Sequence, residues 1–129
     1  MPSGLPAVTG DVLTAANYNS LVAFTVATAN TTDYTAVLAD AYQVLEVMNK
    51  ATAIAYKIPT DASVAFPVGT ALTILNIGAG VCTISAVTPG TTTVLSAGAV
   101  AASPTLAQYK TAVAIKTAAN TWYVVGGIA

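Results

Sequence analysis

The side chains that could carry out chemistry are few, because the chain has nine charged residues and contains neither histidine nor arginine. Catalysis near neutral pH usually recruits His, Arg, a reactive Cys or converging carboxylates, which move protons or hold developing charge. The charged residues are scattered along the chain: Asp11, Asp33, Asp40, Glu46, Lys50, Lys57, Asp61, Lys110 and Lys116. We therefore expect a protein that is not an enzyme and that has no cofactor and no metal site.

The carboxylates form no catalytic or metal-binding motif. Asp33 and Asp40 fall in predicted turns on either side of the segment 34–38, where Asp commonly caps backbone groups. Glu46 lies in the middle of a predicted strand, so we expect it to face solvent or to pair across strands, for example with Lys57. These residues are therefore assigned structural roles.

The remaining candidates are a cysteine, a glycine-rich segment and three aromatic residues. Cys82 lacks a His or Arg that could activate a thiolate, so we expect a small buried hydrophobic residue. Gly78-Ala79-Gly80 is interpreted as a turn, because no helix follows it and the third glycine of a nucleotide loop is missing. Aromatic side chains within predicted strands can stack on sugars or pack in a core, and we favour the core. These aromatic residues are Tyr109, Trp122 and Tyr123.

Charge and hydropathy exclude two classes of partner. Four scattered lysines cannot supply the basic cluster that nucleic-acid binding requires. A membrane-spanning helix needs about 20 consecutive apolar residues, and proline and glycine interrupt the uncharged stretch between Asp61 and Lys110. The segment Met1–Gly4 lacks the positive charge of a signal peptide. We expect no nucleic acid, no membrane and no export, and a single cysteine without a disulfide fits assembly in the cytosol.

From Phe24 onward, the apolar residues recur with a period close to two, which predicts strands. The segments between them are rich in Asn, Asp, Pro and Gly. The predicted strands are Phe24–Ala29, Tyr34–Leu38, Gln43–Met48, Thr52–Ile58, Ala71–Ile77, Val81–Val87, Thr91–Leu95, Gln108–Lys116 and Thr121–Val125. Short strands at this spacing favour a sandwich or a barrel. We expect a mainly β protein, in which residues 24–129 form an antiparallel β-sandwich or jelly-roll-like domain.

Residues 1–23 are predicted to form an N-terminal arm that contains one short helix. Thr14 is a suitable N-cap for a helix over 15–22, and Leu13 and Tyr18 have the spacing of a hydrophobic staple. Such a short helix is unstable alone in water, so it docks either on its own domain or on another subunit. The apolar side chains expected to anchor the arm are Leu5, Val12, Leu13, Tyr18, Leu21, Val22 and Phe24.

The overall composition favours self-association. Hydrophobic residues make up 55% of the chain and charged residues only 7%, against about 25% in an average soluble domain. A net charge of −1 gives little repulsion between copies. We expect the excess apolar surface to be covered by other copies of the chain or by a larger particle.

Several segments, taken in order, resemble a β module that recurs in virion proteins of tailed bacteriophages. The matching segments are Tyr34–Asp40, Val47–Asn49, Ser63–Thr70, Gly78–Gly80, Ala107–Tyr109, Ile115–Ala118 and Asn120–Gly126. The opening segment 10–19 resembles the short N-terminal segment of many phage fibre and structural proteins. The chain departs from the pattern at 41–43, where the usual turn contains glycine.

This resemblance implies a non-enzymatic virion component, usually a homotrimer, with a β-sandwich-like domain. Such modules occur in capsid decoration proteins, tail fibres and head fibres. Because the chain stops directly after the module, we expect a decoration (cement) protein that binds the major capsid protein at the capsid surface after assembly in the host cytoplasm. The alternative is a short tail-fibre or head-fibre protein that contacts the host surface.

Overall fold

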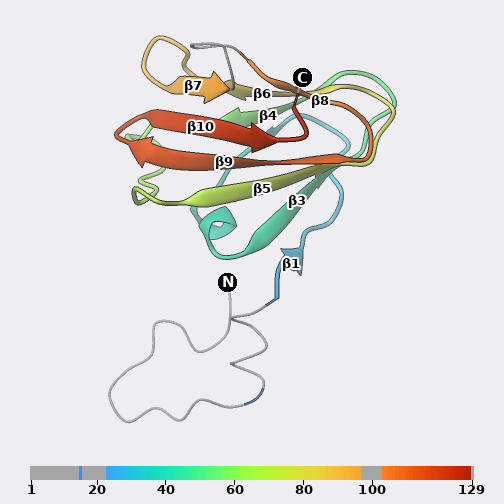
Figure 1. Ribbon diagram of the computed structural model, residues 1–129, viewed down its shortest axis with the longest axis horizontal. Helices are drawn as coiled ribbons and strands as arrows, with labels where there is room; N and C mark the ends of the chain where they lie inside the picture. The colour runs from blue at the N-terminus through green and yellow to red at the C-terminus, as the bar shows by residue number, and fades with distance from the viewer. Residues whose placement is uncertain (1–14, 16–22, 97–102, 129) are drawn as a thin grey trace.

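The computed structural model describes residue 15, residues 23–96 and residues 103–128. Apart from Ala15, the predicted arm helix lies outside the described residues. The described residues form ten strands and one 3-10 helix: β1 (Thr25–Val26), β2 (Tyr34–Thr35), η1 (Leu38–Ala41), β3 (Val44–Met48), β4 (Ile54–Ile58), β5 (Ala71–Asn76), β6 (Cys82–Ala86), β7 (Thr93–Ser96), β8 (Thr105–Leu106), β9 (Lys110–Ala118) and β10 (Thr121–Gly126). The prediction of a mainly β protein is therefore confirmed (Figure 1).

The strands are arranged in two sheets. Sheet A has the order β1-β3-β5-β9-β10-β7, and sheet B has the order β2-β4-β6-β8. Between β1 and β8, each odd-numbered strand lies in sheet A and each even-numbered strand lies in sheet B. From β1 to β8, the chain therefore passes from one sheet to the other after each strand. The hairpin of β9 and β10 is the exception among the described strands, because both lie in sheet A and pair antiparallel.

This alternation makes most pairings parallel, which corrects the antiparallel expectation. The pairs β1/β3, β3/β5, β2/β4, β4/β6 and β7/β10 are parallel. The pairs β5/β9, β9/β10 and β6/β8 are antiparallel. In the pairs β1/β3, β3/β5, β2/β4 and β4/β6, the second strand returns to the sheet after one strand in the other sheet and runs parallel to the first, so these parallel pairs form without crossover helices.

The unit formed by β3, the following turn and β4 lies beside the unit formed by β5, the following turn and β6, because β3 pairs with β5 and β4 pairs with β6. Both strand pairings have the same shift of 28 residues, for example Leu45 to Thr73 and Ile54 to Cys82. The two turns are also joined by their backbones, because the amide of Gly80 donates to the carbonyl of Lys50 (2.9 Å). A Cβ atom on Gly80 would lie 1.8 Å from the carbonyl oxygen of Thr52. Glycine is therefore required where the two turns touch.

Asn76 forms hydrogen bonds with backbone groups of the turn between β5 and β6. Its side chain is fully buried. Its Nδ2 donates to the carbonyls of Gly80 (2.9 Å) and Leu106 (2.8 Å), and its Oδ1 accepts from the amide of Gly78 (3.1 Å). A buried amide with three such partners holds the turn closed, because unpaired backbone groups are costly there.

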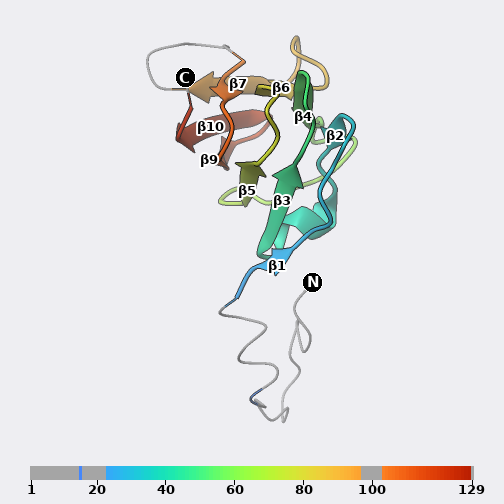
Figure 2. The ribbon, with the colours of Figure 1, turned by 90° about the vertical axis from the view of Figure 1, so that its right-hand side faces the viewer.

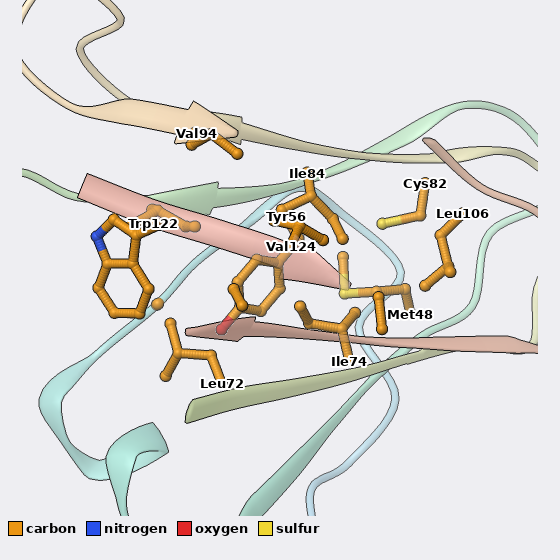
Figure 3. Packing of buried hydrophobic residues seen from close by; sticks show 14 of the residues in the cluster. Met48, Tyr56, Leu72, Ile74, Cys82, Ile84, Val94, Leu106, Trp122 and Val124 are labelled. Atoms are coloured by element: carbon orange, nitrogen blue, oxygen red, sulfur yellow. The ribbon is translucent and has the colours of Figure 1, made fainter. Parts of the chain in front are cut away.

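Side chains from both sheets meet in one core (Figure 3). β4 shows the underlying pattern: Ile54, Tyr56 and Ile58 are buried, whereas the side chains between them are half-buried. Trp122 on β10 is completely buried and packs edge-on against Phe66, with ring centroids 5.5 Å apart. The other large buried side chains include Met48, Leu72, Ile74, Ile84, Leu106 and Val124.

Differences from the predicted elements occur at the short strands. The segments expected to be strands over 24–29 and 34–38 contain only the two-residue strands β1 and β2, and η1 begins at Leu38. β8 was not expected at all. β1 lies at one end of sheet A, beside β3, as both ribbon views show (Figures 1 and 2). None of the described helices has the length and hydropathy of a membrane-spanning helix.

Candidate assembly surface

The charged residues and Cys82 form no catalytic or metal-binding cluster among the described residues. Within the described ranges, no three His, Cys, Asp or Glu side chains lie close enough together to hold a metal ion. Cys82 is completely buried, as expected, and burial raises the pKa of its thiol to about 11. A thiol in this state is protonated near neutral pH and cannot act as a nucleophile.

Two ion pairs account for four of the charged residues, and both pairs connect backbone segments. Lys57 lies 3.9 Å from Asp33 at the surface, and Asp33 also accepts the amide of Ala55 (3.0 Å). Lys116 is almost fully buried and contacts Asp61 at 2.8 Å. The Lys116 hydrogen bond lowers the pKa of Asp61. These contacts support the structural roles assigned to the carboxylates.

The interpretation of Glu46 as a solvent-facing residue or a partner of Lys57 is wrong. Glu46 is 5% exposed, and its Oε1 accepts a hydrogen bond from Asn30 Nδ2 at 3.0 Å. Asp40 is 3% exposed; its Oδ2 accepts the amide of Val37, so it does cap backbone at η1. The alternation in β3 turns Glu46 toward the interior together with Met48, and Lys57 belongs to the opposite face of another sheet.

The outer face of sheet A carries no charged side chain in the rows described below, and most of its side chains are apolar. Strand pairing places its side chains in three rows across the sheet. The first row is Val26, Leu45, Thr73, Val113 and Val125, the second is Ala71, Ile115, Tyr123 and Leu95, and the third is Val47, Leu75 and Thr111. None of these twelve residues is charged. Val26, Tyr123 and Val125 are between 46% and 65% exposed.

The outer face of sheet B has the opposite character. Its pairing places Thr35, Lys57 and Ser85 in one row and Ala55, Thr83 and Thr105 in another. Hydroxyl groups, the Lys57 ammonium and the nearby Asp33 carboxylate make this face polar. The outer face of sheet B is therefore polar, whereas the outer face of sheet A carries no charged residue in the three rows described above.

The aromatic residues divide between core and surface. Trp122 lies in the core as expected, but the same expectation is wrong for Tyr109 and Tyr123, which are 75% and 46% exposed. Tyr123 follows Trp122 in β10 and therefore points to the opposite face. Tyr109 has a positive φ of 63° in the turn before β9, which removes it from the strand pattern.

Of the predicted anchoring residues, only Phe24 belongs to the described part of the chain. It directly precedes β1 and is 56% exposed. The other six anchoring residues, between Leu5 and Val22, lie outside the described residues. Val26 belongs to β1, the edge strand of sheet A, and Phe24 directly precedes that strand.

Comparison with known proteins yields no relative: no protein-family model matches the chain, and neither a curated protein nor a solved structure matches it.

Proposed function

We propose that this protein is a structural, non-enzymatic subunit of a bacteriophage particle. In this proposal it is a capsid decoration protein that binds the major capsid protein as a homotrimer at the surface of the virion. The observation that carries the proposal is the uncharged outer face of sheet A, which is suited to burial against other subunits. The resemblance of its segments to phage virion modules supplies the class of particle. We class the two packed sheets as a β-sandwich.

Burial of this face would provide the binding energy. Apolar surface contributes about 25 cal/mol per Å² removed from water, before the costs of association. Repetition over a capsid lattice adds multivalency, which strengthens modest contacts by orders of magnitude. The arm, with its anchoring residues from Leu5 to Phe24, is proposed to add a second contact with the shell or with a neighbouring trimer.

A matched pair of substitutions tests the face. Thr73 and Thr83 are both half-buried strand residues, on the outer faces of sheet A and sheet B respectively. Thr73→Lys places a charge in the centre of the apolar face and should abolish trimer formation and shell binding. Thr83→Lys should leave both unchanged. The readouts are mass by sedimentation equilibrium and co-sedimentation with shells purified from the same phage without this protein.

The two variants show which sheet carries the binding face. Trimer formation and shell binding by Thr73→Lys at wild-type levels contradict the proposal, and so does loss of both by Thr83→Lys alone. A second pair of changes, Leu13→Asp and Leu21→Asp, tests the arm: shell occupancy should fall while the far-UV spectrum of the domain is retained. Wild-type occupancy by this variant contradicts the anchoring role.

The alternative function, a short tail-fibre or head-fibre protein, is favoured by the exposure of Tyr109 and Tyr123. Exposed aromatic rings can stack on the apolar faces of sugars. Binding of the isolated protein to host cells, lost in Tyr109→Ala and Tyr123→Ala, would support this role. Absence of such binding, together with stoichiometric recovery on shells, would support decoration.

A further inference from the structure

The outer face of sheet A limits the kind of surface that can cover it. The side chains of its three rows carry no charge. A charged group of a partner that was buried there would lose its water without gaining an ion pair, which is unfavourable. A surface that covers this face must therefore be uncharged and largely apolar.

The segment 1–22 of the chain has this character. Asp11 is its only charged side chain. Tyr18, Leu21 and Val22 have the spacing i, i+3 and i+4, which would place them on one side of the predicted helix over 15–22. One apolar side of this kind is suited to packing on the face of a sheet. The predicted anchoring residues within the segment are Leu5, Val12, Leu13, Tyr18, Leu21 and Val22.

The segment is also long enough to cross the face. Sheet A has six strands, and neighbouring strands lie about 4.8 Å apart, so the distance from β1 to β7 is about 24 Å. About 16 residues of helix or about seven residues of extended chain span this distance. Residues 1–22 exceed both lengths. The segment leads into β1, whose Val26 belongs to the first row of the face.

The other surfaces of the chain are less suitable. The outer face of sheet B carries the exposed pair of Lys57 and Asp33. Two sheet A faces packed on each other would form a two-fold dimer. An arm on a face joins two different surfaces, and such a contact can close into a ring of three copies. This step rests on the proposed function, which supplies the trimer.

We propose that residues 1–22 of a neighbouring copy lie on the outer face of sheet A. The apolar side chains of the arm then contact the rows that contain Thr73 and Tyr123. Each copy gives its arm to one neighbour and receives the arm of another. One contact thereby removes the apolar surface of both the arm and the face from water.

Site-directed cross-linking of the full chain tests this arm exchange. Leu21→Cys, in the arm, is co-expressed with Thr73→Cys, in the centre of the face, and the purified protein is treated with a short bifunctional maleimide. Mass spectrometry identifies the mixed product that joins one chain of each variant, which a link within one chain cannot produce. We expect this product in solution and on shells. Val125→Cys, at an exposed position of the same row, is a second face variant and should also give it.

A matched control lies on the other sheet. Ser85, like Thr73, is a half-buried strand residue, but it belongs to the outer face of sheet B. The mixed product should be lost when Ser85→Cys replaces Thr73→Cys. The wild-type chain should give no cross-link, because Cys82 is completely buried.

Three results would overturn the arm exchange. One is an equal yield of mixed product with Ser85→Cys and Thr73→Cys. Another is a link between two Thr73→Cys chains in place of the mixed product, because sheet A would then face sheet A. The third is the absence of mixed product with both face variants in protein that forms trimers and binds shells.

The third result would leave the proposed function intact and refute only the arm contact. It includes the case in which Leu21→Cys and Thr73→Cys link only when they are in the same chain, because each arm would then cover its own sheet. Wild-type protein that is monomeric and does not bind shells would refute the proposed function, and the arm exchange with it.

Discussion

Replacing Asp61 by Asn should destabilise the protein more than replacing its partner Lys116 by Met. The reason is the unequal burial of the two side chains, of which Lys116 is 4% and Asp61 28% exposed. Asp61 without its lysine can turn to water and still accept the amide of Asn120 (3.1 Å). Lys116 without the carboxylate remains a buried charge whose other hydrogen bond is to the carbonyl of Phe66 (2.6 Å).

The magnitudes follow from these contacts. Removing one partner of a buried ion pair costs about 3–5 kcal/mol when a charge is left buried. We expect about 3 kcal/mol for Asp61→Asn, at the low end of that range, because the Phe66 carbonyl still accepts from the ammonium. Lys116→Met keeps the volume of the side chain and should cost about 1–2 kcal/mol for the lost charge-assisted hydrogen bonds. The double variant should be more stable than Asp61→Asn alone, because it buries no charge.

The assay is urea unfolding at pH 6, with the free energy of unfolding compared at unchanged m-value. The reasoning is refuted if Lys116→Met costs as much as Asp61→Asn, or if the double variant is the least stable of the three. Acid provides a control. The pKa of Asp61 is lowered in the folded protein, so its contribution to stability is present above pH 3.8 and is lost as the pH falls through the folded value. The difference between wild type and Asp61→Asn should therefore shrink in strong acid.

Two further predictions concern the contact between the turns and the buried thiol. Gly80→Ala should lower the free energy of unfolding by at least about 2 kcal/mol, because the added Cβ meets the carbonyl of Thr52. Gly90→Ala is the control and should stay within about 0.5 kcal/mol of wild type, because a Cβ there has no heavy atom within 4 Å. Urea unfolding compares the two variants, and equal effects would contradict the close contact between the turns. At pH 8, Cys82 should react with a disulfide reagent orders of magnitude more slowly in the native protein than in urea. In the native protein the thiol is buried, and roughly one thiol in a thousand is ionised at this pH. Similar reaction rates in the two conditions would place the thiol outside the core.

Local patterns predicted the longer strands well. The predicted segments 43–48, 71–77 and 121–125 agree with β3, β5 and β10 within one residue at each end. Alternation also separates the buried side chains of β4 from the half-buried ones. The two-residue strands could not be found in this way, because periodicity needs about four residues to be visible. β8 is therefore defined only by its pairing with β6.

The orientation of polar residues was harder to predict, because both faces of sheet A are apolar. In β3, Leu45 and Val47 alternate with Glu46 and Met48, so the pattern does not indicate which pair faces the core. A charged residue is usually placed in water, and that assumption put Glu46 on the wrong side. The signal that opposes it is Asn30, whose amide satisfies the carboxyl, but the two residues are 16 positions apart. Only the parallel pairing of residues 25–30 with β3 brings them together.

The parallel pairing of β3 with β5 and of β4 with β6 cannot be recognised from repeated residues in the sequence. When residues 45–58 are placed on residues 73–86 with the observed shift of 28, Ala51 and Ala79 are the one identical pair. Stacked positions need compatible size and polarity, which many residue combinations provide. The backbone contact is more demanding, because Gly78 and Gly80 approach Lys50 and Thr52 too closely for any Cβ atom. The glycines first interpreted as a simple turn are thus required for the close contact between the two turns, and the parallel register beside them places twelve uncharged side chains on one face.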